Sequence, residues 1–317
     1  MIVRWSCGEL PAVLAEAGIT RAFLVASPRW ESFASLGPAG HWPEVPSERI
    51  AVSTGADGIL AVGGGSAIDT AKAASSASGL PLVSVPTTYS GAEWAPTFGI
   101  RTAERKMVGG GGGAHLAAIV YDVDLTLDLP RPETVGTALN ALAHSAEALY
   151  GRRSERSDAC ALEGATLISR WLPLVVESPH DREAREGLLR GAAAAGEALA
   201  LAGLALGHAM AQALGGSFGL PHGAMNALTL PAALRFNAAI VPEAVARFGE
   251  AIGAADDPAG RVAELARLGG FERLRELGVP ASGLGGIAEI VAGRRGNEQN
   301  PRPASVDEIE ALLRSIY

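Results

Sequence analysis

A short apolar run ends in three consecutive glycines and opens directly into a helical stretch in the segment GILAVGGGSAIDTAK (58–72). A buried strand that turns tightly into a helix is the repeating unit of a parallel sheet covered by helices. Short apolar runs and helical stretches also alternate along the segments on either side of residues 58–72. The predicted elements are a helix over 11–19, a strand over 22–27, a strand over 58–62, a helix over 67–75 and a strand over 80–85. The first part of the chain therefore predicts an α/β domain.

The pattern changes at Pro130, after which long Ala- and Leu-rich segments have helical spacing and almost no β-branched runs. We therefore predict two domains, an α/β domain over 1–130 and an all-helical domain over 131–317. Residues 31–48, rich in Pro, Gly and Ser, are predicted to be loop. The predicted helices of the second domain are 133–150, 157–176, 182–214, 223–237, 242–253, 258–268, 271–276 and 305–315.

Composition excludes several classes of protein. A net charge of −8 and the absence of a basic run argue against a nucleic-acid partner. Cys7 and Cys160 are too few for a disulfide framework, and the first residues do not form a signal peptide, so we expect a cytoplasmic protein. Residues 198–216 carry no charge, but they are mostly Ala and Gly and include His208. We therefore expect a buried helix there and no membrane partner.

The glycine run predicts a phosphate site. Gly63, Gly64, Gly65 and Ser66 let a pyrophosphate approach the backbone, and the N-terminus of the following helix directs N–H groups at the anion. A tight strand-to-helix turn without a ligand is the alternative. Asp69 and Lys72 follow three residues apart on one helix face and are predicted to contact the cofactor, although an acid there also stabilises a helix without any function.

Two further segments carry polar groups. Thr87, Thr88, Tyr89 and Ser90 follow a predicted strand, where ligands bind at the carboxyl end of a parallel sheet, unless they form only a polar loop. In the second domain, Asn140 and His144 lie four residues apart on one predicted helix, and His208 and His222 follow. In helices otherwise made of Ala, Leu and Gly, these three histidines are better explained by a shared polar site than by three separate packing roles.

The segments GGGSAIDTAK, PTTYSGAEWAP, NALAHSAEALY and GHAMAQALGGSFGLPHG, in this order, resemble the iron-containing alcohol dehydrogenase superfamily and specifically its maleylacetate reductase branch. The likeness extends to the strand-like segment 119–130 and to NPRP at 300–303. It implies the group III alcohol dehydrogenase, dehydroquinate synthase-like architecture. In that architecture a Rossmann-like domain and a helical domain form a cleft in which NADH or NADPH delivers hydride. It also implies a homodimer acting on a small molecule.

In metal-dependent members an Asp and three His hold Fe²⁺ or Zn²⁺, and the matching positions here are Asn140, His144, His208 and His222. Asn140 removes a charge that would offset a divalent cation, so metal affinity should fall. The three histidines are the predicted catalytic residues, stabilising a developing oxyanion. Gln212 stands where family members usually carry another His, and it cannot transfer a proton at neutral pH.

The resemblance implies an NAD(P)H-dependent reductase of an enone or carbonyl, of the type that converts maleylacetate to 3-oxoadipate. Lys106, Arg101 and Tyr89 are the predicted substrate contacts. Ser27, followed by Arg29 and no acid, is predicted at the adenosine ribose, where a 2′-phosphate would not be repelled. Two alternatives remain open: a metal-dependent alcohol dehydrogenase or aldehyde reductase, which Asp69 favours, and a non-catalytic nucleotide-binding relative.

Overall fold

The computed structural model describes residues 1–104 and 106–317, which form two compact units. Unit 1 contains Met1–Thr88 and Ala92–Leu129, and unit 2 contains Tyr89–Gly91 and Pro130–Tyr317. Each unit has a hydrophobic core of its own. The short segment Tyr89–Gly91 thus belongs with the helical unit although it follows a strand of the sheet.

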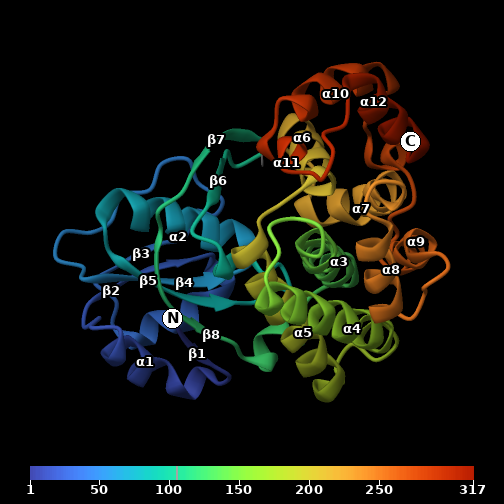
Figure 1. Ribbon diagram of the computed structural model, residues 1–317. Coiled ribbons are helices and arrows are strands. Elements are labelled where there is room, and N and C mark those ends of the chain that lie inside the picture. The colour runs from blue at the N-terminus through green and yellow to red at the C-terminus, as the bar shows by residue number, and fades with distance from the viewer. Residues whose placement is uncertain (105) are drawn as a thin grey trace. The chain divides into compact units, whose positions relative to one another are not determined.

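Unit 1 is built on a six-stranded parallel sheet with the strand order β1-β8-β5-β4-β2-β3 (Figure 1). A separate antiparallel pair, β6 and β7, completes the described strands of this unit. The strands are β1 Ile2–Arg4, β2 Ala22–Ala26, β3 Gly40–Trp42, β4 Gly58–Gly63, β5 Pro81–Pro86, β6 Phe98–Arg101, β7 Met107–Gly111 and β8 His115–Val120. The predicted α/β class is confirmed.

Both faces of the sheet are buried at its centre, which is why every residue of β2 and β4 is buried. Alternate side chains point to opposite faces. Leu24, Leu60 and Val83 join the core beneath α1 (Leu10–Glu16), whereas Phe23 and Ile59 join the core beneath α2 (Gly65–Ser78). Figure 1 shows the two helices on opposite sides of the sheet. This arrangement fixes the carboxyl ends of β4 and β5 side by side, with Gly63 paired to Pro86.

Two predictions about unit 1 are wrong in part. The region 31–48 is not all loop, because it contains the edge strand β3 and part of the 3₁₀ segment Pro28–Leu36. β3 has only three residues and includes no apolar run, so its pairing with β2 left no signal in the sequence. The strand expected over 119–130 ends at Val120, because the Asp122 side chain accepts a hydrogen bond from the Asp124 N–H and begins a 3₁₀ turn over Val123–Thr126.

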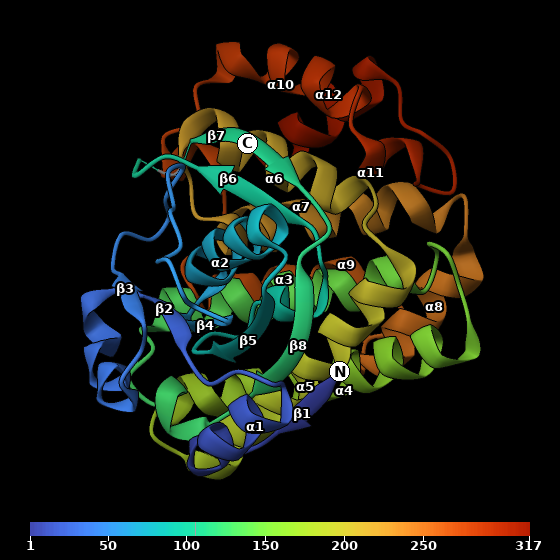
Figure 2. The ribbon, with the colours of Figure 1, turned by 90° about the vertical axis from the view of Figure 1, so that its left-hand side faces the viewer.

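Unit 2 is helical throughout its regular elements (Figure 1), as predicted. Its helices are α3 Arg131–Ala148, α4 Glu155–Glu177, α5 Arg182–Ala202, α6 Leu206–Phe218, α7 His222–Ala238, α8 Pro242–Ala251, α9 Pro258–Arg267, α10 Leu284–Ala292, α11 Arg295–Glu298 and α12 Val306–Ser315. Figure 2 shows α10 and α12 together, with α6 and α7 nearby. Helix α3 is buried along nearly its whole length and packs against α4, α5 and α7.

Three helix predictions in unit 2 are corrected. The single helix expected over 182–214 is broken into α5 and α6, which are bent by 102° at Gly203, a residue with φ of +85°. The stretch 198–216 therefore does not form one straight span, although α4 is long and apolar enough to cross a bilayer by length and composition. The helix expected over 271–276 is a 3₁₀ turn at Leu274–Leu277. Helices α10 and α11 were not predicted, because Gly and Arg interrupt the apolar pattern there.

A buried carboxyl group in unit 1 gives a prediction about stability. Glu93 is 1% exposed, and its Oε1 accepts a hydrogen bond of 2.7 Å from the Tyr121 hydroxyl. Burial raises the pKa of Glu93. The native state therefore favours the protonated acid, and the stability that this group contributes is lost as pH rises through its raised pKa.

We expect Glu93→Gln to unfold at higher urea than the wild type, with a difference that grows as pH rises from acid to alkaline. The glutamine oxygen still accepts from Tyr121, and no buried charge has to form. Urea unfolding at several pH values measures this effect, and Glu31→Gln, at an exposed site, is the control. If the difference in unfolding urea concentration between Glu93→Gln and the wild type did not change with pH, the assignment of Glu93 as a buried carboxyl group with a raised pKa would be contradicted.

Candidate active site

The turn between β4 and α2 in unit 1 is shaped for close approach to its backbone. Gly64 is the N-cap of α2 and offers no side chain to the first turn, so the N–H groups of Gly65 and Ser66 are directed outward at the helix N-terminus. A Cβ on Gly64 would lie 2.8 Å from Thr88 Cγ2, and Gly63 has φ of +149°. Glycine is therefore required at both positions, and the turn presents bare backbone to an anion.

The other residues predicted at this edge lie beside that turn. Thr87 N–H donates to the Gly63 carbonyl at 3.1 Å, which joins the ends of β4 and β5. Thr88 Oγ1 is buried without a hydrogen-bond partner among residues 1–104 and 106–317. Ser27 directly follows Ala26, which pairs with Val62, so it lies at the same carboxyl edge of the sheet. The structure thus gathers the predicted phosphate and hydroxyl groups at one edge.

Asp69 and Lys72 are occupied by internal contacts. Lys72 is 1% exposed, and its Nζ donates to Asp69 Oδ1 at 3.2 Å and to the Thr97 carbonyl at 3.0 Å. The other oxygen of Asp69 accepts from Gly99 N–H at 3.2 Å and lies 3.8 Å from Arg101 Nη1. These contacts of Asp69 and Lys72 hold β6 against α2, and Figure 2 shows the two elements side by side. Their predicted contact with the cofactor stays a prediction.

The predicted substrate residues are dispersed. Lys106 is exposed just before β7, whereas Arg101 is held beside Asp69. Tyr89 is fully buried in unit 2, and its hydroxyl accepts a 3.1 Å hydrogen bond from Arg185. As placed, Tyr89 is a core residue that a substrate does not reach. The sequence could not reveal this because Arg185 is 96 positions away.

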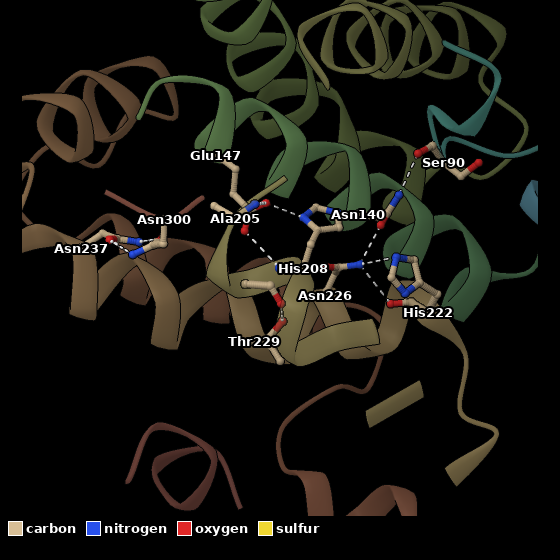
Figure 3. Close-up of polar contacts among 11 residues, drawn as sticks. Ser90, Asn140, Glu147, Ala205, His208, His222, Asn226, Thr229, Asn237 and Asn300 are labelled. Atoms are coloured by element: carbon tan, nitrogen blue, oxygen red, sulfur yellow. Dashed lines mark hydrogen bonds and ion pairs between the residues drawn. The ribbon is translucent and has the colours of Figure 1, made fainter. Parts of the chain in front are cut away.

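Three imidazoles meet inside unit 2, and Figure 3 shows two of them, His208 and His222. His144 comes from α3, His208 from α6 and His222 from the first position of α7. The rings of His144 and His208 are stacked with centroids 4.7 Å apart, and those of His208 and His222 are tilted with centroids 5.9 Å apart. The close crossing of α3 and α7 makes this possible, because a Cβ on Gly223 would lie 2.5 Å from the backbone of Gly136.

Glu147 holds His208 in a defined orientation. This carboxylate, three residues after His144 on α3, is fully buried. Its oxygens accept hydrogen bonds from Ala205 N–H at 2.6 Å, His208 N–H at 3.0 Å and His208 Nδ1 at 2.8 Å (Figure 3). Glu147 therefore caps the N-terminus of α6 and fixes the proton of His208 on Nδ1. This cap fixes where α6 begins after α5 has ended at Gly203.

The opposite nitrogen of His208, Nε2, takes no part in the contact with Glu147. His208 is 1% exposed, and its Nε2 is buried with no hydrogen-bond partner within the described parts of the chain. A buried polar atom without a partner costs free energy, so its retention calls for an explanation. With Nδ1–H committed to Glu147, a protonated His208 presents an N–H at Nε2, and a neutral one presents a lone pair.

A chain of amides links the remaining groups. Asn140 Nδ2 donates to the Ser90 carbonyl at 2.7 Å, and Asn140 Oδ1 accepts from Asn226 Nδ2 at 2.7 Å. Asn226 Nδ2 also lies 3.0 Å from His222 Nε2, which therefore acts as the acceptor (Figure 3). Sequence reasoning did not single out Asn226 or Glu147 as functional. Each is a lone polar residue one turn from a histidine in an apolar helix, which is the signal that could have found them.

The predicted metal ligands do not fit a divalent cation in this arrangement. His222 Nε2 accepts a hydrogen bond from Asn226, so the single lone pair of this nitrogen is not available to a metal, and Asn140 Oδ1 also accepts from Asn226. All four predicted donors are neutral side chains, and the buried acid beside them, Glu147, is hydrogen-bonded to His208. Among the described residues, no group of three or more His, Cys, Asp or Glu is arranged to hold a metal ion.

Comparisons with known proteins agree over nearly the whole chain. The C-terminal model of the Fe-containing alcohol dehydrogenase family matches residues 134–317, and the iron-containing alcohol dehydrogenase model matches residues 48–120. Maleylacetate reductase of Pseudomonas knackmussii is 34% identical over 98% of this chain and 93% of its own length.

Solved structures show the same fold. The iron-containing alcohol dehydrogenase of Corynebacterium glutamicum has a TM-score of 0.88 at 30% identity and covers 100% of this chain and 94% of its own. Maleylacetate reductase of Agrobacterium tumefaciens has a TM-score of 0.86 at 29% identity, with 100% and 95% covered. The resemblance found in the sequence is confirmed. The chain is therefore an NAD(P)-dependent oxidoreductase that belongs to the iron-containing alcohol dehydrogenase family.

Proposed function

We propose that this NAD(P)H-dependent reductase acts on an enone dicarboxylate of the maleylacetate type. The observation that carries the proposal is the buried Nε2 atom of His208, which is held ready by Glu147 and lies against two further imidazoles. Such a group suits a reaction that develops negative charge on oxygen. The similarity to maleylacetate reductases supports the substrate class.

The two units have different tasks in this proposal. Unit 1, which apart from Tyr89–Gly91 and Pro130 is the proposed dinucleotide-binding domain 1–130, holds the pyrophosphate at Gly63–Ser66, with Thr87, Thr88 and Ser27 as nearby polar groups. Unit 2, the proposed catalytic domain 131–317, contributes His144, His208 and His222. The nicotinamide of the cofactor supplies hydride to the substrate that the imidazoles contact.

In the proposed reaction, hydride adds to the alkene carbon that is β to the substrate ketone. The electron pair of the C=C bond moves onto the ketone oxygen and forms an enolate, while NAD(P)H becomes NAD(P)⁺. Protonated His208 donates its Nε2–H to this oxygen, and the buried carboxylate of Glu147 compensates the positive charge on the ring. A proton from water then adds to the α carbon while the enol O–H proton returns to His208 Nε2, so the ketone re-forms and the net change is one hydride and one proton. No step requires a metal, for which the donors do not fit.

Cofactor-oxidation assays test this function. NADH and NADPH are each offered with maleylacetate, other enones and small aldehydes, with and without a chelator. We expect turnover of maleylacetate that survives the chelator. Reduction of aldehydes only, and only with iron or zinc restored, would replace the proposal by a metal-dependent alcohol dehydrogenase. Tight cofactor binding without any turnover would replace it by a non-catalytic nucleotide-binding protein.

We further propose a cytoplasmic homodimer with a small-molecule substrate and neither nucleic-acid nor membrane partners. The net charge of −8 and the absence of a run of basic residues support the exclusion of a nucleic-acid partner. The family resemblance supports the dimer. Light scattering of the purified protein measures its mass directly, and a value of one chain would contradict this assembly.

Substitution of the glycine turn tests the cofactor site. Gly64→Val places a side chain where even a Cβ lies 2.8 Å from Thr88 Cγ2, so the turn must shift away from the anion. We expect the Kd of NAD(P)H to rise by about tenfold or more, which corresponds to about 1.4 kcal/mol. Fluorescence titration measures it. Gly79→Asn at the other end of α2, where the backbone has φ of +74° and a Cβ meets nothing within 4 Å, is the control.

A further inference from the structure

Arg294 lies in unit 2, and among the described residues no acidic side chain balances its charge. It precedes α11, and its Nη1 donates to Gln212 Oε1 at 3.3 Å. Its Nε is buried without a hydrogen-bond partner in the part of the chain that the structure describes, and no acidic neighbour offsets the effect of burial on its charge there. Burial lowers the pKa of Arg294. A half-buried guanidinium with an unmet donor is costly unless an anion binds to it.

The position of Arg294 relates it to His208. Gln212 follows His208 by one turn of α6, so the two side chains lie on neighbouring positions of one helix face, about 5–6 Å apart at Cβ. The segment that carries Arg294 packs on the same face, because a Cβ on Gly296 would lie 2.8 Å from the Ala205 carbonyl and 3.2 Å from Ala209 Cβ. Figure 2 shows α10 and α11 in the same part of unit 2 as α6, and both pack against it.

We propose that Arg294 binds a carboxylate of the substrate one helical turn from His208, so that the enzyme selects anionic enones over neutral ones. This inference rests on the proposed function and names what recognises its substrate. The neutral Oε1 atom of Gln212 accepts a hydrogen bond from Arg294 Nη1. This contact orients the guanidinium group without neutralising its charge. The edge formed by Nε and Nη2 then matches a carboxylate in a bidentate pair.

The proposal also accounts for Gln212. Because a glutamine oxygen only accepts a hydrogen bond from Arg294, the arginine keeps its positive charge for the substrate. An acid at this position would form an ion pair with Arg294 and compete with the substrate carboxylate. The inference therefore concerns two residues, an anion-binding arginine and the amide that positions it.

Kinetics of three variants test the proposal. For Arg294→Gln we expect the KM of maleylacetate to rise by about tenfold to a hundredfold, because a hydrogen-bonded charge is lost, while the KM of a neutral enone such as methyl vinyl ketone stays unchanged. Gln212→Glu should raise the KM of maleylacetate in the same way, although Arg294 is present. Arg295→Gln removes an equal charge at the exposed neighbouring residue and should change neither KM.

Calorimetric binding of fumarate to the enzyme saturated with NAD(P)⁺ gives a readout that needs no turnover. Binding that the wild type shows and Arg294→Gln loses supports the carboxylate site, even if no substrate is reduced and the proposed function fails. Thermal melting of each variant verifies that it is folded. If Arg294→Gln is unstable, Gln212→Glu still tests the proposal, because this variant keeps the arginine in place. Equal losses for neutral and anionic enones, an equal effect of Arg295→Gln, or no fumarate binding to the wild type would overturn the proposal.

Discussion

Replacing His208 by alanine is expected to lower kcat by about 10²- to 10⁴-fold, the usual contribution of a general acid, while the Kd of NAD(P)H changes little. His208 is the ring at the centre of the cluster, contacting both His144 and His222, and its Nε2 is buried without a hydrogen-bond partner among the described residues. Alanine removes the proton donor to the enolate oxygen. It does not touch the glycine turn of unit 1, to which we assign the cofactor.

Steady-state kinetics and a fluorescence titration of NAD(P)H separate the two effects on the same protein sample. His180→Ala, which alters an exposed histidine between α4 and α5, is the matched control and should retain full activity. If His208→Ala keeps the kcat of the wild type, the imidazole cluster is structural. A loss of cofactor binding equal to the loss of turnover would instead assign His208 to the dinucleotide.

The second large effect concerns Glu147, which has a structural role and a positioning role. Glu147→Ala leaves three buried donors unpaired: Ala205 N–H, His208 N–H and His208 Nδ1–H. Each such group costs about 1–3 kcal/mol, so we expect a loss of about 3–5 kcal/mol in the free energy of unfolding, the range found when one partner of a buried ionic contact is removed. Urea unfolding measures it, with Glu163→Ala at an exposed position of α4 as the control.

Glu147→Gln separates positioning from stability. The amide keeps one oxygen as an acceptor for the α6 backbone but removes the negative charge that faces the His208 ring. We expect most of the stability to return while kcat stays about tenfold to a hundredfold below the wild type, the usual cost of changing the partner that orients a functional histidine. The pH dependence of kcat should also shift. An unchanged pH profile with full kcat would limit Glu147 to capping α6.

The sequence predicted the sheet of unit 1 well because its signal is local. The strands at 22–27, 58–62 and 80–85 are continuous apolar runs, as burial on both faces requires, and all three are confirmed. β3 was missed because it is a short edge strand held by backbone pairing with β2. Its Gly, His and Trp residues give no periodic pattern that could be recognised before the partner strand is known.

The break between α5 and α6 could not be predicted for a related reason. Residues 198–216 are apolar on every side, so the pattern is compatible with one long helix. Helix α5 ends at Gly203, whose φ is +85°, and the start of α6 is capped by the carboxylate of Glu147, which is 58 positions from Ala205 in the sequence. Helix α10 was missed because Gly285 and Gly286 lower the helical propensity of its first turn.

The sequence predicted the histidines of the candidate site, but it did not predict the residues that support them. His144, His208 and His222 are polar residues in apolar helices, so their convergence could be inferred from spacing and composition. Glu147 and Asn226 follow the same rule but only act through partners on other helices. For Tyr89, Asp69 and Lys72, residue type suggested a ligand contact, and the structure shows that internal partners occupy them.

A crystal structure of the enzyme with NAD(P)H and fumarate would test the central claim most directly. The account predicts the pyrophosphate on the backbone of Gly63–Ser66 and the reactive C4 carbon of the nicotinamide turned toward His144, His208 and His222. Fumarate should lie between that carbon and these rings. A dinucleotide bound elsewhere, or a nicotinamide directed away from the three imidazoles, would contradict it.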